Sequence, residues 1–259
     1  MFNLTLFKKK QMKKTWYLEQ FENEDIHFFF VGRRAIIKKV LSSFYSPNNR
    51  DRIRVVEIGC GTGGNLSMLS AFGYLYAVES NNEAISLASG RNICDIQFGS
   101  LPNNLPLQEK YDLICLLDVL EYVDDDLGSL RTLGHLLAPS GKILLTVPAY
   151  KFLWSSHDIG VENKRRYEKK ELLELVSKAD LHPVYLTYFN TILFPMIAII
   201  RIIDKAMNKH NDTNKTDVVL PLRPVNFLLK HLFSLEQFII PRYTLPYGLS
   251  LLLLLEKKE

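Results

Sequence analysis

The clearest chemical pattern in this sequence is a set of glycines and acids that follow two neighbouring apolar segments. Gly59, Gly61 and Gly64 have the spacing G-x-G-x-x-G and follow the apolar run Arg54–Ile58. Such a turn between a strand and a helix lets the backbone approach a nucleotide closely. Glu79 closes the next apolar run, 20 residues after Gly59, and an acid at this place accepts hydrogen bonds from ribose hydroxyls. The pattern therefore predicts a ligand that contains adenosine.

Glu57 lies two residues before Gly59 and bears on which adenosine compound binds. A carboxylate close to a pyrophosphate repels it at short range, which disfavours NAD. S-adenosylmethionine has no phosphate and carries a sulfonium and an amino group, both cationic, so an acid beside the loop favours it. The alternative is that Glu57 is a surface carboxylate paired with Arg52 or Arg54, an interaction that typically contributes under about 1 kcal/mol.

Length and composition are those of a globular protein without a nucleic-acid signature. The chain has 259 residues, of which 47% are hydrophobic and 23% are charged, and a single α/β domain is expected at this size. The net charge of +4 is too small by itself to indicate nucleic acid. Three cysteines, Cys60, Cys94 and Cys115, form no CxxC pair. We therefore expect no metal site and no disulfide framework, and a reducing, cytoplasmic location.

The N-terminal residues have no long apolar run of the kind found in signal peptides. Five lysines cluster there, at Lys8, Lys9, Lys10, Lys13 and Lys14. They form either a solvated terminus or a contact with anionic lipid headgroups.

Short apolar runs alternate with helical stretches, which predicts βαβ units and a largely parallel sheet. The expected strands are Arg54–Ile58, Tyr74–Val78, Asp95–Phe98, Leu113–Leu117, Lys142–Val147, Val184–Tyr188 and Ser250–Leu255. The expected helices are Gly64–Ala71, Asn82–Gly90, Asp126–Leu137 and Lys169–Ala179.

The long segment Asn190–Tyr247 lies outside this alternation and needs structure of its own. Its apolar run Ile192–Ile203 is interrupted by Pro195 and Arg201 and is too short to span a bilayer, which takes about 20 residues. It is either a buried helix of a cap over the site or a helix that lies in the membrane interface. The polar stretch Asn211–Asp217 is expected to be a loop.

Three motifs in order resemble those of class I S-adenosylmethionine-dependent methyltransferases. Val55–Gly63 is similar to the first motif of that family, and Tyr111–Asp125 is similar to the motif at its fourth strand. Leu137–Pro148 is similar to the turn into its fifth strand and the strand itself. The resemblance covers about Arg54–Tyr188 and concerns the small-molecule methyltransferase subgroup.

The resemblance implies a doubly wound, mostly parallel, seven-stranded Rossmann-like α/β sheet with an antiparallel last strand. Within one domain over residues 1–259 it implies an N-terminal helical lid (1–50), a cofactor-binding core (51–189), a helical insertion (190–247) and the last strand (248–259). The implied cofactor residues are Glu57, Gly59, Cys60, Gly61, Gly63, Glu79, Ser80, Ser100, Leu101, Asp118, Val119 and Leu120.

Two of these regions depart from the family pattern. Many relatives have an acid after the third strand that holds the adenine amino group, whereas this chain has Ser100, a weaker acceptor. Many relatives also read Glu-His after the fourth strand, where this chain has Glu121 and Tyr122.

The segment after the fifth strand is expected to face the acceptor, because ligands of open α/β sheets lie beyond the carboxyl ends of the strands. His157 is our candidate for a general base, since its ordinary pKa of about 6.5 suits that task, and Asp158 or Glu121 would orient it. Tyr150 and Trp154 are candidate walls of the acceptor pocket. Arg165 and Arg166 are candidate ligands for an acidic group of the substrate.

Together these features predict methyl transfer from S-adenosylmethionine to an oxygen or carbon atom of a small or lipid-like acceptor. An NAD-dependent oxidoreductase and a non-catalytic binding protein are the alternatives. A nucleic-acid substrate is disfavoured, because no Asn-Pro-Pro-Tyr-like sequence follows the fourth strand. Peripheral membrane contact is left open, and the sequence does not determine the oligomeric state.

Overall fold

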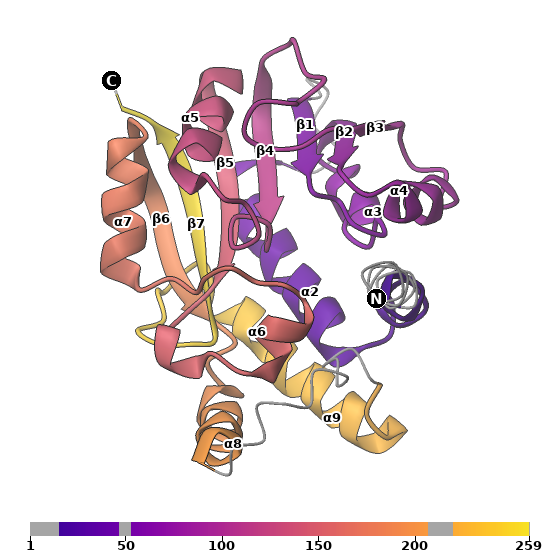
Figure 1. Ribbon diagram of the computed structural model, residues 1–259, viewed down its shortest axis with the longest axis vertical. Coiled ribbons are helices and arrows are strands. Elements are labelled where there is room, and N and C mark those ends of the chain that lie inside the picture. Colours follow the sequence, from indigo (N-terminus) through magenta and orange to yellow (C-terminus); the bar gives the residue numbers. More distant parts are fainter. Residues whose placement is uncertain (1–15, 47–52, 207–219, 259) are drawn as a thin grey trace, which may run out of the picture.

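A mixed β-sheet with helices on both faces organises the part of the chain that the computed structural model describes, residues 16–46, 53–206 and 220–258 (Figure 1). In these residues the sheet has seven strands in the order β3-β2-β1-β4-β5-β7-β6. Strand β7 is antiparallel to both β5 and β6, and the other pairs are parallel. The expected fold class is confirmed. The strands are β1 (Ile53–Ile58), β2 (Gly73–Glu79), β3 (Ile96–Phe98), β4 (Tyr111–Leu117), β5 (Leu137–Pro148), β6 (Leu181–Phe189) and β7 (Ser250–Lys257).

The helices begin where the sequence supplies side chains that cap free backbone amides. The Asn81 side chain accepts hydrogen bonds from two amides at the start of α4, and the Asp125 side chain accepts one at the start of α5. Residues 16–23 are helical as well. The named helices are α2 (Phe28–Phe44), α3 (Leu66–Leu69), α4 (Asn82–Ser89), α5 (Asp126–Leu136), α6 (Ser156–Gly160), α7 (Lys169–Lys178), α8 (Phe194–Ala206) and α9 (Arg223–Ser234), with 3-10 turns η1 (Lys151–Leu153) and η3 (Leu235–Phe238).

Two apolar layers sandwich the sheet, and the alternation of side chains along β4 shows how. Ile114 and Leu116 pack with residues of α5 and α7, whereas Leu113 and Cys115 pack with residues of α2 and α9. Successive residues of a strand point to opposite faces, so a central strand that is apolar throughout is buried on both. This double burial fixes the ends of the central strands, where the loops of the site begin.

Several elements differ in extent from those that the sequence predicts, among them β5, which begins at Leu137 instead of Lys142. Helix α3 is limited to Leu66–Leu69, because the residues before it remain in the glycine turn, where Gly64 packs against Glu24. Strand β6 begins at Leu181 instead of Val184 and includes Pro183. Proline is tolerated there because β6 is the edge strand of the sheet, and the register shifts next to it.

The insertion between β6 and β7 is attached to the sheet through a buried acid. Both oxygens of Glu236 accept hydrogen bonds from backbone amides, from Asn190 at 2.7 Å and from Thr191 and Ile192 at 2.7 and 2.9 Å. Phe233 of α9 is fully buried and packs against Gly32 of α2. No helix in the described ranges is both long and apolar enough to cross a membrane. The lysine cluster Lys8–Lys14 and the loop expected at Asn211–Asp217 lie outside the described residues.

Candidate active site

The glycine loop leaves β1 with a backbone that side chains would obstruct. Gly59, Gly61 and Gly63 have φ angles of +75°, +55° and +86°, which are rarely adopted by residues with a Cβ. A Cβ on Gly59 would lie 2.5 Å from Cγ2 of Val119, in the loop after β4. The loops after β1 and β4 therefore meet in close contact at the carboxyl edge of the sheet.

Glu79 joins the glycine loop to the loop after β2. Its Oε2 accepts a hydrogen bond from the Gly61 amide at 2.8 Å, and its Oε1 accepts from the amides of Ser80 and Asn81 at 2.7 and 2.9 Å. The carboxylate is thus held by three backbone amides at the place where the sequence predicts an acceptor for ribose hydroxyls.

Glu57 is buried at the base of the loop, with 1% of its surface exposed. Its Oε1 accepts a hydrogen bond from Asn65 Nδ2 at 2.8 Å, whereas its Oε2 is buried without a hydrogen-bond partner among the described residues. Burial raises the pKa of Glu57 to about 8. The alternative that Glu57 is a surface carboxylate is wrong, since Arg54 pairs with Glu109 at 2.9 Å instead.

Asp118 follows β4 and is held from two sides. Its Oδ2 lies 3.0 Å from a guanidinium nitrogen of Arg33, and its Oδ1 accepts a hydrogen bond from the Thr146 hydroxyl at 2.9 Å. Arg33 comes from α2 and is 6% exposed, and its Nε is buried without a hydrogen-bond partner in the described part of the chain. The N-terminal region therefore contributes a buried cation to the carboxyl edge of the sheet.

The residues after Asp118 divide between the site and the core. Val119 packs against Gly59, but the Leu120 side chain is fully buried in the core, and only its carbonyl is used, by the Tyr167 hydroxyl at 3.3 Å. Glu121 is 2% exposed, and its Oε2 likewise has no hydrogen-bond partner in the described ranges. Burial, followed by the nearby Asp118 carboxylate, holds the pKa of Glu121 well above its ordinary value.

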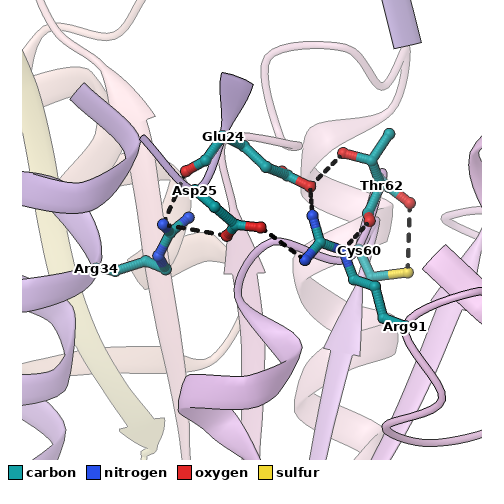
Figure 2. Close-up of polar contacts among 7 residues, drawn as sticks. Glu24, Asp25, Arg34, Cys60, Thr62 and Arg91 are labelled. Atoms are coloured by element: carbon teal, nitrogen blue, oxygen red, sulfur yellow. Dashed lines mark hydrogen bonds and ion pairs between the residues drawn. The ribbon is translucent and has the colours of Figure 1, made fainter. Parts of the chain in front are cut away.

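A set of ion pairs fastens the N-terminal region over the glycine loop (Figure 2). Glu24 accepts hydrogen bonds from the Thr62 hydroxyl at 2.8 Å and from Arg91 at 2.6 Å. Arg91 also donates to the Thr62 carbonyl at 2.8 Å and to Asp25 at 3.0 Å, and Arg34 donates to the Glu24 carbonyl at 2.7 Å.

The helical segment 16–23 lies close to the loop as well. Gln20 Nε2 is 3.7 Å from the position that a Cβ on Gly61 would take. Burial, and then the nearby Glu79 carboxylate, raise the pKa of Tyr17 to about 12. These contacts put the N-terminal region where the sequence predicts a lid.

Comparison with known proteins identifies the fold and the family. A methyltransferase domain family matches residues 30–184, more than half of the chain. This chain is a class I S-adenosylmethionine-dependent methyltransferase. No match to a curated protein was found.

Solved methyltransferase structures share the fold at low sequence identity. A chain of the Haloferax volcanii complex between the Trm112 methyltransferase activator and a methyltransferase is 16% identical, with a TM-score of 0.59 over 95% of this chain and 97% of that one. A TehB-like S-adenosylmethionine-dependent methyltransferase from Corynebacterium glutamicum is 11% identical, with a TM-score of 0.51 over 85% and 86% of the two chains. An S-adenosylmethionine-dependent methyltransferase from Clostridium acetobutylicum is also 11% identical, with a TM-score of 0.51 over 87% and 90%. None of the comparisons supports the oxidoreductase alternative.

The residues at the carboxyl edge fit the cofactor of the methyltransferase family. Three buried polar atoms, Glu57 Oε2, Glu121 Oε2 and Arg33 Nε, have no hydrogen-bond partner in the described part of the chain. Such atoms cost free energy unless a ligand satisfies them. Two acidic oxygens and one cationic nitrogen match the charges of S-adenosylmethionine, which has an ammonium, a sulfonium and a carboxylate.

The predicted acceptor-side residues of the methyltransferase fall into two groups. Tyr150, Trp154 and His157 are half-buried, and the Tyr150 ring stacks on Tyr188 with centroids 5.4 Å apart and contacts Phe194 of α8 at 5.6 Å. These rings form an aromatic wall beyond β5 and β6. The side chains of Asp158, Arg165 and Arg166 instead have internal partners.

Asp158 is fully buried, and both of its oxygens are occupied. It accepts hydrogen bonds from the Ser155 amide at 2.9 Å, from Asn163 at 2.9 Å and from Arg166 Nε at 2.8 Å. Arg166 also donates to the Ala149 carbonyl at 3.1 Å, and Arg165 pairs with Asp126 at 2.6 Å. These contacts hold the loop that carries His157, and they give Arg165 and Arg166 partners within the protein.

The region after β3 is arranged as a tight turn. The Ser100 amide donates to the Asn104 carbonyl at 2.7 Å, and Leu101 packs against the main core.

The sequence analysis missed Arg33, Thr146, Glu24 and Arg91. These residues contact partners that are distant in the sequence, and the motifs gave no signal for such contacts.

Proposed function

We propose that this methyltransferase methylates an oxygen or carbon atom of a small, lipid-like acceptor. The cofactor part of this proposal rests on the buried Oε2 of Glu57, which has no hydrogen-bond partner among the described residues and lies beneath a glycine loop with left-handed backbone. The proposed cofactor site consists of Glu57, Gly59, Cys60, Gly61, Gly63, Glu79, Ser80, Ser100, Leu101, Asp118 and Val119, with Leu120 through its backbone, and we add Arg33.

When bound, S-adenosylmethionine supplies a methyl group activated by the sulfonium. Glu57 and Glu121 provide negative charge for its cationic groups, and Arg33 provides positive charge for its carboxylate. Glu79 fixes the loop backbone and is placed to accept from ribose hydroxyls. The lid fastened by Glu24 and Arg91 excludes water from the loop. Alignment of the reactants is the main contribution of the protein to such a displacement.

His157 is the proposed base that takes the proton of the acceptor. It is half-buried and lies on α6, whose backbone is fixed by Asp158. The aromatic wall of Tyr150 and Tyr188 offers an apolar surface for a lipid-like acceptor. A cytoplasmic location fits the three free cysteines, of which Cys60 and Cys115 are buried.

Calorimetry and turnover test the two parts of the proposal separately. S-adenosylhomocysteine should bind to the purified chain and NAD should not, and binding of NAD alone would overturn the cofactor assignment. In turnover, acceptors with an alkyl chain should show a higher kcat/KM than analogues with the same reactive group and no chain. Equal values would contradict a lipid-like acceptor and leave the cofactor assignment intact.

A further inference from the structure

Helix α8 departs from the usual amphipathic pattern, because both of its faces carry apolar side chains and Arg201 points inward. Phe194, Ile197, Ala198 and Arg201, at spacings of three and four residues, face the protein. Arg201 donates to the Leu153 carbonyl at 3.0 Å, so the charged side chain of the central turn points inward. The opposite face carries exposed apolar side chains, Met196, Ile199, Ile200, Ile202 and Ile203. Soluble helices place such side chains inward and cations outward.

Helix α9 and the residues after it continue this apolar surface. α9 packs against α2 through Phe233, and Asn226 binds the backbone of Phe28 and Ile26 at 2.8 and 2.9 Å. Its other side exposes Leu222, Val225, Phe227 and Leu228, and Leu235, Phe238, Tyr243 and Tyr247 are exposed beyond it. We call the exposed apolar side chains of α8, α9 and residues 235–247 the insertion face. Exposed apolar groups of this number mark an interaction site.

The exposed charged side chains that the structure describes around the insertion face are cations. Arg223 and Arg242 are exposed, and Lys230 is half-buried, with its ammonium over the Phe227 ring. Glu236 is the one acid whose side chain the structure describes in residues 192–247, and it is buried against backbone amides. Cations next to apolar and aromatic groups match the anionic interface of a bilayer, where lysine, arginine and tyrosine are favoured. They disfavour a symmetric contact between two copies, which would bring like charges together.

We infer that the insertion face docks on a bilayer that contains anionic phospholipid. The two helices lie at one end of the molecule, on the side to which the carboxyl ends of β4 and β5 point (Figure 1). Docking there places the aromatic wall near the membrane. Glu236 holds the chain between β6 and α8, so the face is presented on a fixed support. The inference does not require the proposed acceptor, because membrane binding needs no turnover.

Vesicle flotation of the full chain tests the inference without cofactor. Vesicles of phosphatidylcholine mixed with phosphatidylglycerol should bind the protein, and vesicles of phosphatidylcholine alone should bind it more weakly. The double variant Ile199→Ser with Phe227→Ser removes two side chains that are 58% and 62% exposed, and it should weaken partitioning by at least about tenfold. The matched control Tyr74→Ser, at a residue 56% exposed on β2, should bind as the unmodified protein does.

A second variant tests the charge contribution. Arg223→Gln with Lys230→Gln should reduce the preference for anionic vesicles by about fivefold for each cation removed. A thermal transition like that of the unmodified protein shows that each variant is folded. The inference is overturned if the unmodified protein does not float, or if the apolar double variant floats equally well. It is also overturned if the protein is a dimer that the apolar double variant dissociates, because the face would then join two copies.

Discussion

The Glu24 carboxylate and the Arg91 guanidinium form a 2.6 Å ion pair that joins the N-terminal region to the segment after α4. Their side chains are 4% and 16% exposed, and Arg91 also binds the carbonyl of Thr62 in the glycine loop. One arginine therefore connects the lid to the loop that it covers. Because the pair is largely buried, loss of one partner leaves the other as a buried charge without a counter-charge.

Replacement of Arg91 by methionine should destabilise the protein by about 3 kcal/mol, since Glu24 would stay buried without its cation. Urea unfolding of the two proteins measures the difference. Arg54→Met is the matched control, because the Arg54–Glu109 pair is 48% and 51% exposed and its loss should cost less than about 1 kcal/mol. Equal losses for the two variants would show that the Glu24–Arg91 pair does not fasten the lid.

Cofactor affinity should depend on pH through Glu57. Burial raises the pKa of this group to about 8, and the ammonium group of the ligand favours the ionised form. The Kd of S-adenosylhomocysteine should therefore rise as the pH falls below about 8, by up to about tenfold for each unit. Glu57→Gln should remove this dependence and bind weakly at every pH, whereas Glu109→Gln should retain it. A flat profile for the unmodified protein would contradict the assignment of Glu57.

Glu57→Gln should weaken cofactor binding but stabilise the folded protein in the absence of ligand. In the folded chain the proton is held up to about pH 8, whereas the unfolded chain releases it near the ordinary carboxyl pKa of 4.5. The Glu57 contribution to the free energy of unfolding therefore falls as the pH rises from about 4.5 to 8. Above pH 8, Glu57→Gln should be more stable than the unmodified protein, by on the order of 5 kcal/mol. Equal free energies of unfolding for the two proteins above pH 8 would mean that the Glu57 carboxylate does not destabilise the unliganded protein.

The sheet and the glycine loop could be predicted because their signals are local. A short strand, a glycine turn and the acid at the end of the next strand all lie within Arg54–Glu79. The lid contacts could not be predicted in this way. Arg91 meets Glu24 across 67 positions, and Arg33 meets Thr146 across 113, and no periodicity relates residues so far apart.

The sequence also could not predict which arginine side chains point into the protein. In the sequence Arg166 is a candidate substrate ligand and Arg201 only interrupts an apolar run, yet Arg166 binds Asp158 and Arg201 binds the Leu153 carbonyl. The sequence left the role of Ile192–Ile203 open between a cap and a membrane element. One side of α8 packs against the aromatic wall, and its other side carries exposed apolar side chains. The sequence alone does not show which side packs inward.

Gly59 should tolerate no side chain, for two separate reasons. Its φ of +75° is unfavourable for residues with a Cβ, and the added atom would lie 2.5 Å from Val119. Gly59→Ala should therefore lose several kcal/mol of stability, measured by thermal unfolding, and bind S-adenosylhomocysteine poorly. Gly134→Ala is the matched control, because the nearest atom to its new Cβ is 3.6 Å away. In the last turn of α5 it should be neutral or stabilise by up to about 1 kcal/mol.

His157 and Asp158 are neighbours that should fail in different ways when they are changed. Asp158→Asn removes the charge that binds Arg166 at 2.8 Å in a buried position, so it should lower the melting temperature and lower turnover through loss of folded protein.

His157→Ala should leave the melting temperature and the Kd of S-adenosylhomocysteine unchanged while kcat falls by about 100-fold, the usual contribution of a general base. Because a base must be deprotonated, kcat of the unmodified enzyme should also decline as the pH falls below the ordinary histidine pKa of about 6.5. Undiminished turnover in the folded His157→Ala protein would exclude His157 as the base.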